Sequence, residues 1–110
     1  MPTEYDKLVH DRIPEIIEGN DETPVTRRVE GAEYDAYLAE KLVEEATEFR
    51  EARTDDDEDA DAELADVLEV VETLLDWRDR SHVNRIRTAK ASERGRFAEG
   101  IVLERVENEG

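Results

Sequence analysis

Residues 41–49, KLVEEATEF, decide the predicted fold, because apolar side chains recur there at helical spacing. Leu42, Ala46 and Phe49 follow the i, i+4, i+7 pattern of an amphipathic helix. At about 100° per residue, Glu45 projects about 60° from Leu42 and about 40° from Phe49. The stretch therefore predicts a helix that directs a carboxylate toward its own apolar side.

The helical pattern extends outward from this stretch, from Ala32 to about Arg53. The acidic run at residues 54–62, TDDDEDADA, predicts a solvated link. A second long helix is predicted from about Asp61 to Arg80, and its apolar residues cover roughly half of its circumference. Such a face needs partner helices. We therefore predict an all-α fold in which two long antiparallel helices complete a four-helix core by forming a homodimer or homotetramer.

Shorter elements flank the two long helices. Residues 10–20, HDRIPEIIEGN, predict a short helix capped by Asp11, with a proline in its first turn. Ser81 is the predicted N-cap of a further helix that ends at Gly95. Short extended segments are expected near the two termini, including RFAEGIVLERV at residues 96–106. No repeat or second domain is evident, so residues 1–110 are predicted to form a single domain.

The composition limits the classes of partner. The chain holds 15 Lys and Arg against 32 Asp and Glu, a formal net charge of −17. Such a surface repels nucleic acid and anionic membranes, so neither is expected as a partner. Only three of the basic residues are Lys, and the excess of acids fits a protein kept soluble in concentrated salt, so we expect a halophilic host.

Other sites are excluded by residue type. The chain has no cysteine, which removes disulfides, zinc–thiolate sites and thiol nucleophiles. No apolar run reaches the length needed to span a bilayer, and the N-terminal residues lack the apolar region of a signal peptide. A cytoplasmic location is therefore expected.

The second long helix, like the first, carries acidic residues on its apolar side. Glu63 and Asp66 fall within its apolar face, as Glu45 and Glu48 do at or near the apolar stripe of the first helix. Residues three apart are neighbours on a helix surface, so antiparallel packing can bring all four acids together. Ionised carboxylates in a half-buried cluster need a compensating positive charge. An all-oxygen ligand set favours Mg²⁺, with Mn²⁺ as a possible substitute. Chance pairs of acids on solvated helix flanks are the alternative reading in so acidic a chain.

The motifs resemble those of a known family. The pattern EExxE followed by ExxD stands here as Glu44-Glu45-x-x-Glu48 and Glu63-x-x-Asp66, and it resembles the all-α nucleoside triphosphate (NTP) pyrophosphohydrolase superfamily of MazG-like and phosphoribosyl-ATP pyrophosphohydrolase-like proteins. The blocks YDKLVHDRIPEII and KASERGRFAEGIVL resemble those flanking this motif in its short, house-cleaning branch, which acts on non-standard NTPs. The resemblance spans nearly the whole chain.

The resemblance implies a MazG-like helical subunit that oligomerises and hydrolyses the α–β phosphate bond of NTPs to a nucleoside monophosphate and pyrophosphate. It implies Mg²⁺ ligands at Glu45, Glu48, Glu63 and Asp66, with Glu45 and Glu48 also catalytic. Glu44 matches the motif but is expected to point outward, as a helper at most. The substrate phosphates need cations, for which the candidates are Lys90, Arg94, Lys41, Lys7 and Arg12.

Two other functions stay open on the sequence alone. The first is phosphoribosyl-ATP pyrophosphohydrolysis in histidine biosynthesis, which shares the ExxE and ExxD motifs but fits the flanking blocks less well. The second is a non-catalytic, acidic helical dimer that acts as a scaffold. The scaffold predicts no dependence on divalent ions, whereas the enzymes predict that metal stabilises the fold.

Overall fold

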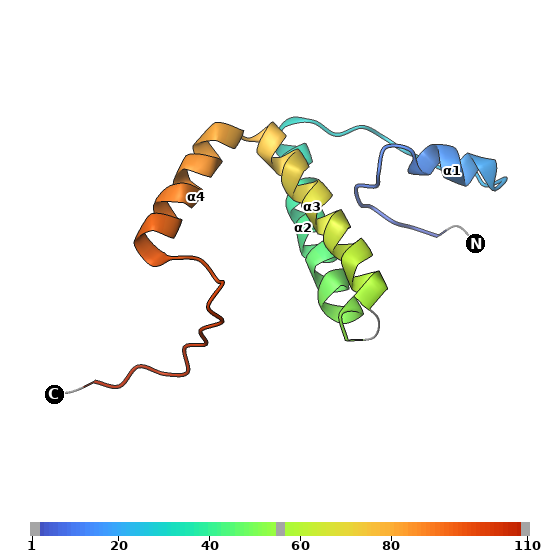
Figure 1. Ribbon diagram of the computed structural model, residues 1–110. Coiled ribbons are helices and arrows are strands. Elements are labelled where there is room, and N and C mark those ends of the chain that lie inside the picture. The colour runs from blue at the N-terminus through green and yellow to red at the C-terminus, as the bar shows by residue number, and fades with distance from the viewer. Residues whose placement is uncertain (1–2, 55–56, 109–110) are drawn as a thin grey trace. The chain divides into compact units, whose positions relative to one another are not determined.

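Helices carry most of the chain in the computed structural model, which describes residues 3–54 and 57–108. They are α1 (Ile13–Gly19), α2 (Gly31–Ala52), α3 (Asp57–Trp77) and α4 (Arg80–Arg94), shown in Figure 1. No strand forms among the described residues, which confirms the all-α prediction. The chain divides into two compact units, Met1–Arg78 and Asp79–Gly110. The single-domain assignment stays a prediction.

The first unit is built on an antiparallel pair, α2 against α3, which lie side by side in Figure 1. One end of the pair is closed by side chains from the start of α2 and the end of α3. The rings of Tyr34 and Trp77 meet edge to face at a centroid distance of 5.2 Å. Asp35 accepts hydrogen bonds from the Trp77 indole at 3.2 Å and from Arg78 at 2.8 Å. These contacts fix the alignment of the two helices and hence the positions of their acids.

The core of this pair is small. Leu38 is 3% exposed, Ala60 is 6% exposed and Val70 is 9% exposed. Leu64 and Leu68, which belong to the broad apolar face predicted for the second long helix, are 47% and 59% exposed. A single partner helix covers only part of a face that occupies half of a circumference. Oligomerisation, which would cover the remainder, stays a prediction.

The helix boundaries follow the sequence closely for α2 and less closely for α3. The prediction for α2 is correct to within one residue at each end. Helix α3 begins four residues earlier than expected and ends three residues earlier, so much of the predicted acidic link is helical. Acidic side chains are favoured in the first turn of a helix, where they face the positive end of the macrodipole. Residues 55–56 of that link lie outside the described residues.

Two predicted N-caps are wrong. Helix α1 has Arg12, not Asp11, at its N-cap position, and no side chain caps it, although the proline does lie in its first turn. Helix α4 is capped by Asp79, whose Oδ1 accepts a hydrogen bond from the backbone N–H of His82 at 3.1 Å. Ser81 was expected in that role because α3 was extended too far. The predicted end of α4 at Gly95 is confirmed.

Asp79→Ala is expected to destabilise α4 by about 1 kcal/mol, because it leaves an N–H of the first turn without its side-chain acceptor. Ser81→Ala serves as the matched control and is expected to leave the helix unchanged. Helical circular dichroism during thermal unfolding measures both. Equal losses in the two variants would contradict the assignment of the cap to Asp79.

None of the described helices is long and apolar enough to cross a bilayer.

Candidate metal and phosphate site

Five acidic residues from α2 and α3 form two overlapping groups of three that share one residue. Oxygen atoms of Glu44, Glu45 and Glu48 lie within 4.8 Å of one another, and so do oxygen atoms of Glu45, Glu63 and Asp66. The four acids predicted to converge are thus brought together through Glu45. The antiparallel pairing of the helices makes this possible, because each pair of acids spans one helical turn.

Glu45 is the most confined of these acids. It is only 4% exposed, the one charged or polar residue that is buried among those the structure describes. Its Oε2 atom is buried without a hydrogen-bond partner, and the same holds for Oε2 of Glu63 across the helix pair. A buried carboxylate oxygen without a donor costs free energy, on the order of 1–3 kcal/mol. A cation that accepts oxygen ligands would satisfy both atoms.

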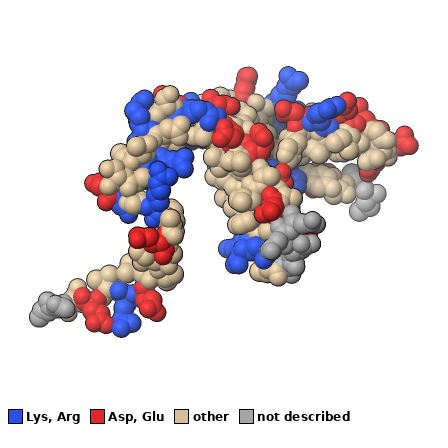
Figure 2. All heavy atoms as spheres, viewed as in Figure 1, with Lys and Arg blue, Asp and Glu red and all other residues tan. Residues whose placement is uncertain are grey.

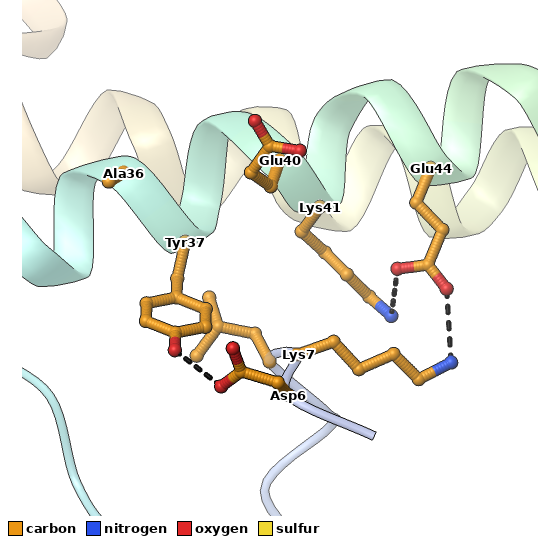
Figure 3. A pocket seen from close by; sticks show the side chains of 8 residues that line it. Asp6, Lys7, Ala36, Tyr37, Glu40, Lys41 and Glu44 are labelled. Carbon is orange, nitrogen blue, oxygen red and sulfur yellow. Dashed lines mark hydrogen bonds and ion pairs between the residues drawn. The ribbon is translucent and has the colours of Figure 1, made fainter. Parts of the chain in front are cut away.

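Two lysines neutralise one side of the cluster. The Lys41 ammonium lies 3.2 Å from Oε2 of Glu44 and 3.2 Å from Oε1 of Glu45. The Lys7 ammonium, from the N-terminal segment, lies 3.0 Å from Oε1 of Glu44 (Figure 3). Glu44 is therefore part of the cluster and is paired with both lysines, contrary to the outward orientation predicted for it. The prediction failed because Glu44 lies off the apolar stripe of the helix, and helical position alone does not show that two long lysine side chains reach it.

Burial and charge change the acidity of these groups. Desolvation, followed by the nearby carboxylate of Glu48, raises the pKa of Glu45 above its ordinary value despite the opposing effect of Lys41. For Glu44, desolvation acts to raise the pKa, but hydrogen bonds and charge from Lys7 and Lys41 together lower it. The cluster thus holds one carboxyl group that resists ionisation and one that is stabilised as an anion.

The raised pKa of Glu45 predicts a pH effect on the stability of the metal-free protein. The native state holds the Glu45 proton more tightly than the unfolded chain, where the pKa is about 4.3. The resulting stabilisation is complete below that value and is lost as the pH rises through the native-state pKa. As the pH rises from about 4.3 through the native-state pKa, we expect wild type to lose stability relative to Glu45→Gln. Denaturant unfolding at several pH values, with a chelator present, measures the free energy of unfolding of both proteins. A difference independent of pH would contradict it.

A short N-terminal segment, residues 6–10, contacts acids of the cluster on both α2 and α3. Its Lys7 pairs with Glu44 on α2, and its His10 Nε2 lies 3.5 Å from Oδ1 of Asp66 on α3. Asp6 accepts a hydrogen bond from the Tyr37 hydroxyl at 2.5 Å. These partners are far apart in the chain, so helical periodicity alone did not predict the contacts. The segment thus places one basic side chain against an acid of each helix.

The remaining phosphate candidates lie at other helices, α1 and α4. Arg12 pairs with Glu15 at 3.2 Å on α1. Lys90 and Arg94 belong to α4, a helix of the second unit. Helix α4 alone carries five Lys or Arg residues and one Glu. Figure 2 shows these basic side chains gathered over α4. Phosphate binding by these three residues stays a prediction.

Comparison with known proteins gives little further identification. No family model matches the sequence, and no solved structure matches it. An uncharacterized protein of Mycolicibacterium smegmatis is 50% identical over 50 residues, which is 46% of this chain and 51% of that protein. The chain therefore matches about half of that relative's length.

Proposed function

We propose that the chain is a Mg²⁺-dependent NTP pyrophosphohydrolase of the MazG-like, all-α superfamily. The reaction adds water across the α–β phosphate bond of an NTP, with non-standard NTPs as the expected substrates, and yields a nucleoside monophosphate and pyrophosphate. The observation that carries this proposal is the buried carboxylate of Glu45, whose Oε2 has no donor. It shares an acid group with Glu63, whose Oε2 atom is likewise buried without a partner. The EExxE motif contains Glu45, and the ExxD motif contains Glu63.

The residues present fit a hard divalent cation. Every donor in the two groups is a carboxylate oxygen, and Mg²⁺ or Mn²⁺ favours oxygen ligands. Glu45, Glu48, Glu63 and Asp66 are the proposed ligands. When bound there, Mg²⁺ would neutralise phosphate charge and make a water molecule more acidic.

The protein's own groups account for the other requirements. Glu48, at the less confined side of the cluster, is the proposed acceptor for the proton of the attacking water, with Glu45 positioned beside it. Lys41 and Lys7 are the proposed phosphate-binding cations, because both ammonium groups already lie at the edge of the cluster. Their present partner, Glu44, holds them there between substrates.

The proposed enzyme acts as a homodimer or homotetramer. The half-exposed Leu64 and Leu68 of α3, with Val43 of α2 at 63% exposure, supply apolar area for further helices. Covering a leucine side chain contributes about 1.5–3 kcal/mol. Light scattering of the purified protein in concentrated salt tests the oligomeric state.

Release of pyrophosphate from a panel of standard and modified NTPs, with and without Mg²⁺ and in concentrated salt, tests the activity. Chromatography of the nucleotide product separates α–β cleavage, which gives a monophosphate, from β–γ cleavage, which gives a diphosphate. Phosphoribosyl-ATP is included as a separate substrate. We expect Mg²⁺-dependent monophosphate and pyrophosphate. Folded protein that hydrolyses only phosphoribosyl-ATP would move the function to histidine biosynthesis, and no hydrolysis at all would favour the scaffold.

A further inference from the structure

A groove of about 480 Å³ lies between the N-terminal segment and α2, next to the acid cluster. Its volume falls within the range of small-molecule sites, roughly 300–1,000 Å³. The lining includes Asp6, Lys7 and Leu8 from the N-terminal segment and Tyr37, Lys41 and Glu44 from α2. The groove shares Lys41 and Glu44 with the metal and phosphate site. A ligand whose phosphates lie at that site would therefore place its next chemical group in the groove.

The two ends of the groove differ in chemistry, as Figure 3 shows. Lys7 and Lys41 converge on Glu44 at one end, and Tyr37 and Asp6 are paired at the other. Tyr37 precedes Lys41 by one helical turn, which is about 6 Å along the helix axis. In an NTP, the sugar is the group that follows the α-phosphate at such a short distance. The Asp6 end of the groove is thus positioned for the sugar and not for the terminal phosphates.

The Asp6 carboxylate is held in place and can still accept further hydrogen bonds. The Tyr37 hydroxyl donates to its Oδ1 at 2.5 Å and itself accepts from Nη2 of Arg27 at 3.0 Å. Arg27 is fixed in turn by Glu33, through contacts of 3.2 and 3.1 Å. No hydrogen bond reaches Oδ2 of Asp6 from any residue in 3–54 or 57–108. An ionised carboxylate offers acceptors only, so the group it recognises must carry O–H or N–H donors.

The backbone of Asp6 is also held in an unusual conformation. Its φ of 114° lies in a region that non-glycine residues rarely adopt. Such conformations persist where surrounding contacts enforce them, and they concentrate at binding and catalytic sites. The hydrogen bond from Tyr37 and the neighbouring Lys7–Glu44 ion pair are contacts of this kind.

We propose that this groove binds the ribose of the substrate, with the Asp6 carboxylate accepting hydrogen bonds from the 2′- and 3′-hydroxyls and Tyr37 positioning that carboxylate. A carboxylate that binds the ribose hydroxyls is an established solution in nucleotide-binding proteins. The inference rests on the proposed function for the identity of the ligand. It adds a sugar preference, for ribonucleotides over 2′-deoxyribonucleotides, which the metal cluster alone does not provide.

The test compares each ribonucleoside triphosphate with its 2′-deoxy counterpart carrying the same base. For wild type we expect kcat/KM for pyrophosphate release to favour the ribonucleotide by about tenfold or more, because the 2′-deoxy sugar loses one of its two hydrogen bonds to a charged carboxylate. Asp6→Asn is expected to bring this ratio close to one, mainly through a higher KM for the ribonucleotide. Tyr37→Phe is expected to reduce the ratio partly, and Asp11→Asn, outside the groove, is the matched control that preserves it.

A second measurement separates this inference from the hydrolytic function. Calorimetric binding of adenosine monophosphate and deoxyadenosine monophosphate requires no catalysis, and we expect tighter binding of the ribonucleotide by wild type but not by Asp6→Asn. Hydrolysis of ribo- and deoxyribonucleotides at equal kcat/KM would overturn the sugar inference while the proposed function stands. A preference for particular bases that changes in Asp6→Asn, with the sugar ratio unchanged, would also overturn it. Absence of hydrolysis with equal or no binding of the two monophosphates would reject both.

Discussion

Glu45→Gln is expected to reduce Mg²⁺-dependent pyrophosphate release by roughly 100-fold or more, a larger loss than that usual for residues which only support a metal ligand. The substitution keeps the size of the side chain but removes the negative charge that both acid groups share. It also leaves Lys41 paired with Glu44, so the local fold is expected to persist. Initial rates at saturating NTP and varied Mg²⁺ measure the effect.

The matched control for this prediction is Glu51→Gln, an exposed acid on the same helix α2. Its rate is expected to stay within about twofold of wild type, because surface carboxylates away from a site contribute little. Circular dichroism establishes that both variants are folded. Equal activity in wild type and Glu45→Gln would remove Glu45 from the catalytic machinery and leave its burial to be explained by packing alone.

Metal-linked stability is the second large effect. A ligand that binds only the folded state at about 100 times its Kd stabilises it by about 2.7 kcal/mol. For a chain of this size, that corresponds to a rise in Tm of roughly 10 °C. We expect Mg²⁺ to produce such a rise in wild type and little or none in Glu63→Gln, because Oε2 of Glu63 is one of the two buried oxygens without a partner.

Glu69→Gln, an exposed acid on the same helix α3, is the matched control and is expected to keep the full rise. In metal-free buffer Glu63→Gln is expected to unfold at a temperature equal to or above that of wild type, since it replaces a carboxyl group whose Oε2 is buried without a partner. If Mg²⁺ raised the Tm of wild type and Glu63→Gln equally, the stabilisation would come from screening of the surface charge and not from this site.

Periodicity predicted the central helices well, because their apolar stripes are long and regular. The same pattern predicted that Glu45 faces inward, and in the structure Glu45 is only 4% exposed. Both ends of α3 and the start of α4 were predicted less well. The start of α3 was missed because acidic residues fit both a solvated link and a first helical turn. Asp79 and Ser81 are both favourable N-cap residues, and only the end of α3 decides between them.

The contacts made by the N-terminal segment had no local signal in the sequence. Lys7 reaches Glu44 across 37 positions, and Asp6 reaches Tyr37 across 31. The exposed His10 side chain likewise lies 3.5 Å from Asp66, on a helix far along the chain. Pairings of this kind depend on how an irregular segment crosses two helices. The acids of the cluster could be predicted from the sequence, but the side chains that surround them and form the groove could not.

Calorimetric titration of Mg²⁺ into the purified protein in concentrated salt, with wild type and Glu45→Gln compared directly, tests the central claim that the shared acid cluster holds a divalent cation. The account predicts saturable binding in wild type and loss of that binding in the variant. Absence of binding in wild type, or the same binding in both proteins, would contradict it.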